Sequence, residues 1–122
     1  MIVYLAGGMK SGWQDVVINS GVKAQWINPR EHGLTQPEEY TRWDMDGIFV
    51  CDIVFAYLEE NNPAGQNMMF EIGYAVGLSK HVIYADCKKE WDARTKMAQC
   101  AVDYYYTNLN NAIKKLDQLC KE

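Results

Sequence analysis

Residues 53–58 (IVFAYL) constrain the fold more than any other segment of the chain. The six residues are apolar or aromatic without interruption, so the segment has no polar face. Such a run is typical of a strand that is covered on both sides of a sheet. Strands of this kind occur in parallel sheets, whose neighbouring strands need a crossover connection that is usually a helix. The run therefore predicts an α/β architecture with helices on both faces of the sheet.

Strand and helix patterns alternate along the rest of the chain. We expect strands at residues 1–6, 24–28, 53–58, 82–85 and 104–107. We expect helices from residue 11 or 12 to 19 and at 37–50, 67–78, 91–101 and 108–119. This alternation predicts a doubly wound parallel sheet of about five strands.

Composition limits the class of protein. The chain has 122 residues, 48% of them hydrophobic and 23% charged, which is ordinary for a globular protein, and we expect a single domain over residues 1–122. A net charge of -4 gives no general attraction to nucleic acid or to an anionic membrane, so neither is an expected partner. The apolar start of the chain is short and lacks a basic leader, which favours a first strand over a signal peptide.

The four cysteines give no sign of a metal site. Cys51, Cys87, Cys100 and Cys120 are widely spaced, without a paired C-x-x-C and without a nearby histidine. Zinc ligands normally occur at closer, regular spacings, so we expect no bound metal. Free thiols in a reducing compartment are the simpler explanation, and we expect the protein to be cytoplasmic.

Glu71 has an unusual setting, within the segment Glu71-Ile72-Gly73-Tyr74-Ala75. A carboxylate among apolar and small residues costs free energy when it leaves water. Glu71 also lies near the start of a helix that follows a strand, which is where open α/β sheets place their ligand crevice. The alternative is a solvated glutamate on an exposed helix face; its neighbours favour a functional role.

Other candidate site residues follow the ends of neighbouring strands. These include the turn Gly7-Gly8-Met9, Arg30 after Pro29, and the loop 61–66 that leads to Glu71; Asp44 lies on the helix before the third strand. Adjacent glycines let a ligand approach the backbone, although a plain turn explains them equally well. Two carboxylates such as Glu71 and Asp44 can share glycosidic chemistry, one as nucleophile and the other as acid. The dinucleotide fingerprint and the phosphate loop are both absent.

Several further residues have two interpretations. Trp13 and Trp43 either flank a planar base or fill gaps between helix and sheet. Met9 is a candidate for a flexible contact with a ligand. Arg30 either binds a ligand oxygen or holds a neighbouring loop, and His32 has no partner pattern that suggests catalysis.

Taken together, four segments resemble the nucleoside 2-deoxyribosyltransferase family. They are residues 4–9 (YLAGGM), 28–30 (NPR), 44–52 (DMDGIFVCD) and 70–75 (FEIGYA), and the resemblance covers about residues 1–86. It implies a flavodoxin-like fold and cleavage of the N-glycosidic bond of 2′-deoxynucleosides without a cofactor. In this family pattern Glu71 matches the nucleophile, Asp44 the acid that exchanges a proton with the base, and Tyr4 the tyrosine beside sugar and nucleophile.

The resemblance also suggests how the substrate is held and which rival functions remain. Gln66 and Asn67 are candidates for contacting the 5′ end of the sugar. The expected reaction transfers the sugar to another nucleobase; the alternatives are a 5′-monophosphate N-glycosidase and a non-catalytic nucleotide-binding module. Relatives that hydrolyse monophosphates carry serine and arginine where this chain has Gly8 and Lys10. Family sites are completed at subunit contacts, so a homo-oligomer is expected.

Overall fold

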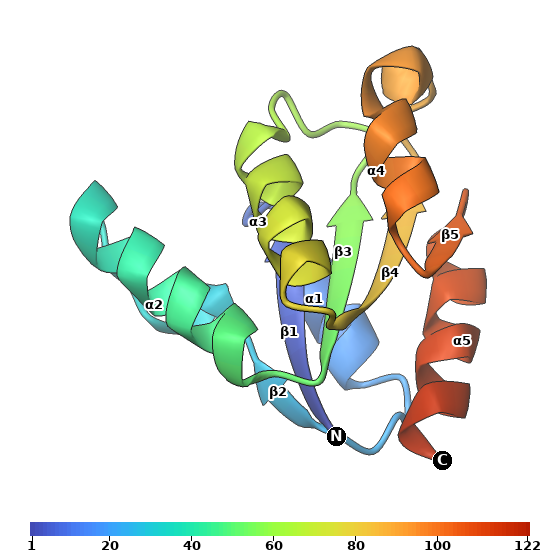
Figure 1. Cartoon of the computed structure of the whole chain (residues 1–122), viewed down its shortest axis with the longest axis horizontal. Helices are drawn as coiled ribbons and strands as arrows, with labels where there is room; N and C mark the ends of the chain where they lie inside the picture. Colours follow the sequence, from blue (N-terminus) through green and yellow to red (C-terminus); the bar gives the residue numbers. More distant parts are fainter.

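The computed structural model describes residues 1–122 and contains one five-stranded sheet (Figure 1). All four neighbouring strand pairs are parallel, in the order β2-β1-β3-β4-β5. The strands are β1 (Ile2–Gly7), β2 (Gln25–Ile27), β3 (Ile53–Leu58), β4 (His81–Asp86) and β5 (Tyr104–Tyr106). This order is that of the flavodoxin-like doubly wound folds, so the predicted fold class is confirmed.

Helices cover both faces of the sheet (Figure 1). One face packs against α1 (Trp13–Ile18) and α5 (Leu109–Cys120). The other packs against α2 (Pro37–Val50), α3 (Gln66–Gly77) and α4 (Lys96–Ala101). No helix combines the length and the apolar character that a membrane span requires.

The strands divide their side chains between the two faces with a period of two. In β3, Ile53 and Phe55 belong to the α1 and α5 side, whereas Val54, Ala56 and Leu58 belong to the α2 and α3 side. All five are buried, which explains why the segment shows no polar face in the sequence.

The order of the strands creates a crevice at the carboxyl ends of β1 and β3. After β1 the chain moves outward to β2, and it then returns to the opposite side of β1 to form β3. The connections after these two central strands therefore leave the sheet in opposite directions. Open α/β sheets bind their ligands at this switch point.

The expected helix at 91–101 is only partly formed. Lys89–Thr95 is a 3-10 helix (η2), and regular α-helix begins at Lys96. Two contacts hold the side chains of η2: the Thr95 hydroxyl donates to Asp86 Oδ2 at the end of β4 at 3.0 Å, and Trp91 packs over Gly65, which precedes α3. These contacts, and not the helical periodicity of the sequence, explain why residues 91–95 are not α-helical. A second 3-10 turn, η1 (Pro29–Glu31), lies in a region that we expected to be a loop.

Gly47 determines how closely α2 approaches the sheet. A Cβ atom at this position would lie 3.0 Å from Ile27 Cγ2 and 3.1 Å from the ring of Tyr4. The absence of a side chain lets the helix pack directly on the Tyr4 ring. Asp44 lies one turn earlier on the same helix, so this close approach brings it to the end of β1.

We predict that Gly47→Ala destabilises the protein by about 1 kcal/mol. The expected gain in helix propensity, also about 1 kcal/mol, is outweighed by overpacking that typically costs about 1–3 kcal/mol. Gly73→Ala is the matched control, because Gly73 is also helical but has no atom within 4 Å of its Cβ position. The control should gain about 0.5–1 kcal/mol in chemical denaturation. Equal effects of the two substitutions would contradict this account of the α2 packing.

Candidate active site

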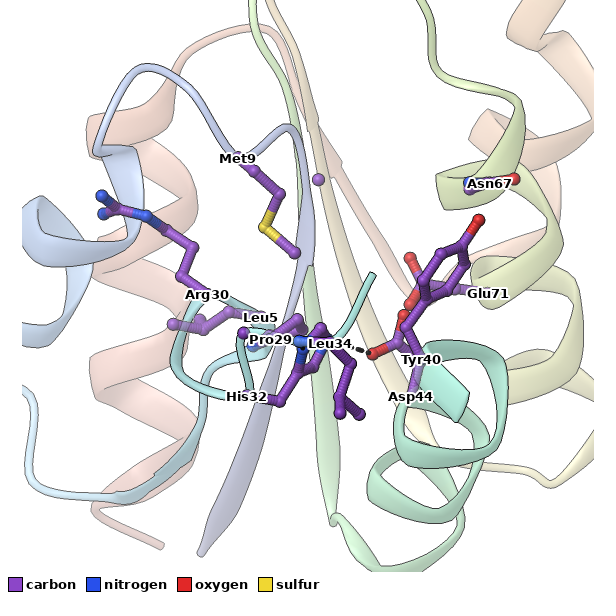
Figure 2. Close-up of a pocket in the computed structure, with 12 residues that line it drawn as sticks. Leu5, Met9, Pro29, Arg30, His32, Leu34, Tyr40, Asp44, Asn67 and Glu71 are labelled. Atoms are coloured by element: carbon purple, nitrogen blue, oxygen red, sulfur yellow. Dashed lines mark hydrogen bonds and ion pairs between the residues drawn. The ribbon is translucent and has the colours of Figure 1, made fainter. Parts of the chain in front are cut away.

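A cavity of about 420 Å³ lies at the carboxyl end of β1, at the switch point of the sheet (Figure 2). Figure 2 shows side chains from three directions converging on it, from the β1 loop, from the η1 region and from α2 with α3. Its lining comprises Leu5, Gly7, Met9, Pro29, Arg30, His32, Gly33, Leu34, Tyr40, Asp44, Asn67 and Glu71. Both predicted carboxylates are therefore at one cavity.

Glu71, which lines this cavity, is hydrogen-bonded to Tyr4. Tyr4 lies on β1 and is fully buried, and its hydroxyl donates a short hydrogen bond to Glu71 Oε2. Burial, followed by the neighbouring Glu71 charge, raises the pKa of Tyr4 far above its ordinary value. The hydroxyl therefore keeps its proton and acts as a donor.

The pKa of Glu71 is raised to about 7. Burial is the main cause, because leaving water disfavours the charged form. The hydrogen bond from Tyr4 opposes this effect, and the negative charge of Asp44 adds to it. Near neutral pH the Glu71 side chain is thus divided between its protonated and ionised states.

Asp44 is the second acid of the cavity. It lies on α2, and 22% of its side chain is exposed. Burial raises the pKa of Asp44, while His32 and Tyr4 act in the opposite direction. Two acids with raised pKa values in one cavity are typical of acid–base sites, because one can ionise while the other keeps a proton.

His32 also lines the cavity, and the sequence indicated no role for it. Its Nδ1 accepts a hydrogen bond from the Leu34 backbone N–H at 2.8 Å. Its Nε2 faces Asp44 Oδ1 at 3.6 Å, and its ring meets the edge of Trp43 at a centroid distance of 4.8 Å. Figure 2 shows the approach of His32 to Asp44 as a dashed line. The pairing depends on how η1 folds back toward α2, which no spacing in the sequence reveals.

The turn after β1 allows close backbone packing. A Cβ atom on Gly7 would lie 2.4 Å from the Tyr57 carbonyl oxygen. The Gly8 carbonyl oxygen accepts hydrogen bonds from Trp13 Nε1 and from Gln14 Nε2, both at 2.8 Å. Gly7 and the partly exposed Met9 line the cavity, whereas Gly8 does not.

The two tryptophans are not among the lining residues. Trp13 is 3% exposed and packs on Phe55 and Tyr57 in the core, so it is not available to stack on a base. Trp43 packs against the His32 ring and borders a neighbouring groove. Of the two interpretations of Trp13, the structure therefore favours the packing role.

The remaining predicted binding residues are divided between cavity and surroundings. Asn67, in the first turn of α3, lines the cavity. The Gln66 side chain instead folds back to accept from the Gly65 N–H at 3.1 Å. Arg30 lines the cavity and also pairs with Asp15 of α1 at 3.4 Å. No group of three or more His, Cys, Asp or Glu side chains could hold a metal ion.

The same fold occurs in solved structures of known activity. A 2-deoxyribosyltransferase from Bacillus psychrosaccharolyticus has a TM-score of 0.71 at 20% identity, over 95% of this chain and 96% of that one. The chain has the fold of the 2-deoxyribosyltransferases. A CMP N-glycosidase from Clostridium botulinum, BcmB, has a TM-score of 0.64 at 20% identity over the full length of both chains.

A third structure with this fold is more distant. A 2-deoxyribosyltransferase from Leishmania mexicana has a TM-score of 0.57 at 21% identity, over 70% of this chain and 63% of that one. No protein-family model and no curated protein sequence matches the chain. The resemblance to the 2-deoxyribosyltransferases is thus confirmed at the level of the fold.

We predict that Tyr4→Phe moves the titration of Glu71 to a pH above 7. Removing the hydroxyl takes away the one interaction that lowers the pKa of Glu71 and leaves the effect of burial unopposed. It should also cost about 1–3 kcal/mol of stability at alkaline pH, where the buried carboxylate has lost its donor. Carboxyl ¹³C NMR across a pH series measures the titration directly.

Tyr40→Phe is the matched control for this experiment, because Tyr40 lines the same cavity without a hydrogen bond to Glu71. An unchanged Glu71 midpoint in Tyr4→Phe, or an equal shift in both variants, would show that the Tyr4 hydroxyl does not control Glu71.

Proposed function

We propose that this chain cleaves the N-glycosidic bond of 2′-deoxynucleosides and transfers the deoxyribosyl group to another nucleobase. The observation that carries this proposal is the enclosed Glu71 carboxyl, held by the Tyr4 hydroxyl at a cavity that also contains Asp44. The shared fold with 2-deoxyribosyltransferases supports it. The proposal covers residues 1–122 as one catalytic domain and requires no cofactor.

In the first step, the ionised Glu71 oxygen attacks C1′ of the sugar. The bond from C1′ to the base nitrogen breaks, and its electron pair stays on the base. Asp44 donates a proton to the leaving base, which makes that base a better leaving group. The result is a deoxyribosyl ester on Glu71 and an ionised Asp44.

In the second step, a different base replaces the first. Asp44 accepts a proton from the incoming base while the base nitrogen attacks C1′ and expels the Glu71 carboxylate. Each step inverts the configuration at C1′, so the overall reaction retains it. The ionised Asp44 left by the first step is the state that the second step needs.

Tyr4 contributes by fixing the attacking carboxylate before the substrate arrives. Its hydroxyl holds Oε2, which leaves the other Glu71 oxygen free to attack. A fixed negative charge also stabilises the positive character that develops on the sugar in the transition state. Asn67 at the start of α3 and Arg30 on η1 are the polar groups we assign to binding the sugar, with Met9 covering it from the β1 loop.

Hydrolysis of a deoxynucleoside 5′-monophosphate is the second candidate function. Its support is the similarity of the whole chain to a CMP N-glycosidase structure. Arg30 is the only lysine or arginine that lines the cavity, and it already pairs with Asp15. Lys10 is exposed and is not part of the lining, so a phosphate has few available partners. The retained pair Glu71 and Asp44 argues against a non-catalytic binding module.

A base-exchange assay tests the proposal. The protein is incubated with 2′-deoxyinosine and excess free adenine, and the products are separated by chromatography. Formation of 2′-deoxyadenosine supports transfer; release of hypoxanthine and free sugar alone would instead favour the hydrolase. Release of base only from the 5′-monophosphate would replace the proposed substrate class.

We predict that Glu71→Gln lowers the rate of exchange at least about 1,000-fold, because an amide cannot form the glycosyl ester. Wild-type protein should gain the mass of one deoxyribosyl group on the peptide that contains Glu71 when it is quenched during turnover. Glu60→Gln is the matched control: Glu60 is exposed on the loop after β3, outside the cavity lining, and its variant should keep full activity. An unchanged rate in Glu71→Gln would exclude Glu71 as the nucleophile.

We also propose that the chain self-associates in a reducing cytoplasm through its α2 and α3 surface. Phe49, Val50 and Phe70 are each at least 58% exposed on these two helices, which contact one another. Large apolar side chains that are exposed together on adjoining helices are typical of association surfaces. Light scattering should give a mass above the 14.0 kDa of one chain, and Phe70→Asp should reduce it. A wild-type protein that remains monomeric at assay concentration would contradict this.

A further inference from the structure

His32 and Asp44 present two buried polar atoms to each other across 3.6 Å. His32 Nε2 and Asp44 Oδ1 are inaccessible to solvent, and neither has another hydrogen-bond partner. Buried polar groups in proteins are nearly always paired, so an isolated donor and acceptor at this separation need an explanation. The distance is just beyond a hydrogen bond, and a small movement of either side chain would close it.

The backbone decides which nitrogen of His32 carries the proton. The Leu34 N–H donates to Nδ1 at 2.8 Å, so Nδ1 must be an acceptor. In a neutral imidazole the single proton then lies on Nε2. That N–H faces Asp44 Oδ1, and an ionised carboxylate oxygen can only accept a hydrogen bond. The ring is further held by its edge contact with Trp43.

We propose that His32 is a positioning residue, whose Nε2–H holds Oδ1 of Asp44 and leaves the other Asp44 oxygen to exchange the proton with the nucleobase. This inference rests on the proposed function. The exposed part of the Asp44 side chain does not include Oδ1, which is consistent with the second oxygen facing the cavity. The contact supports the ionised state of Asp44, which is the state that must accept a proton from the incoming base.

Other charged groups face the same acid. Tyr4 faces it from β1, and Glu71 faces it from α3. Burial raises the pKa of Asp44, and the Tyr4 hydroxyl lowers it. Arg30 lies on η1, two residues before His32, but its guanidinium is paired with Asp15. After burial, which raises the pKa of Asp44, the neighbouring His32 has the largest effect and lowers it. Its removal should therefore raise that pKa.

A titration that needs no turnover tests the pairing. Carboxyl ¹³C NMR follows Asp44 in the wild type, in His32→Leu and in His32→Gln, whose amide N–H can replace Nε2–H. We expect the Asp44 midpoint to move to higher pH in His32→Leu and to stay near the wild-type value in His32→Gln. The same midpoint in all three proteins would overturn the proposal. Tyr40→Phe serves as the control for a general change in the cavity.

Kinetics with two leaving groups then test the role in proton exchange. In 4-nitrophenyl 2-deoxyribofuranoside the leaving group departs as a stable anion, whereas a nucleobase needs a proton. His32→Leu should lower kcat on 2′-deoxynucleosides about 10- to 100-fold and change the nitrophenyl substrate by less than about 3-fold. Asp44→Asn should show the same pattern, and the double variant should be no slower than Asp44→Asn alone.

Equal losses on both substrates would assign His32 a merely structural role and overturn the proposal. Multiplicative losses in the double variant would also overturn it, because they would mean that His32 acts independently of Asp44. Failure of the wild type on both substrates would instead refute the proposed function, and the titration of Asp44 would still decide whether His32 controls this carboxyl.

Discussion

The hydrogen bond between Tyr4 and Glu71 connects the core of the sheet to the cavity. One partner is a fully buried residue of a central strand, and the other is a carboxyl that the same core deprives of water. A carboxyl whose pKa is higher in the folded than in the unfolded protein binds its proton more tightly when folded. Its ionisation therefore costs nothing below about pH 4.5 and the full amount above about pH 7. That amount is on the order of 3 kcal/mol, a large part of the stability of a typical domain.

Such a cost is hard to explain by packing alone. An apolar side chain or a glutamine at position 71 would avoid it, so the fold tolerates an acid where a neutral residue would be more stable. Strained or destabilised groups of this kind concentrate at functional sites. The physical argument for the proposed role of Glu71 therefore comes from its environment in this chain.

Three features of the architecture bring the second acid to this position. The strand order reverses at β1, so the connections after β1 and β3 diverge and open a crevice. Gly47 lets α2 lie directly on the Tyr4 ring, and Asp44 is one turn from that contact. The η1 turn then places His32 Nε2 at 3.6 Å from Asp44 Oδ1. A change in any of these would separate the two acids or leave Asp44 without its neighbour.

Much of this arrangement could be predicted from the sequence. The unbroken apolar run at β3 and the alternation of patterns were sufficient for the sheet, and the setting of Glu71 was sufficient to single it out. Trp13 and Trp43 were ambiguous, because core packing and base stacking both use large aromatic residues. Trp13 packs on Phe55 and Tyr57 in the core. The short turn η2 and the approach of His32 to Asp44 depend on contacts between segments far apart in the chain. Local propensity contains no information about such contacts.

The two acids have different neighbours, and the proposed reaction uses them in opposite protonation states. Tyr4 makes a hydrogen bond to Glu71, whereas His32 stands 3.6 Å from Asp44 and makes none. The proposed reaction starts from an ionised Glu71 beside a protonated Asp44. Once the first base has taken the proton, a closer approach of His32 to Asp44 would support the new charge until the second base restores it.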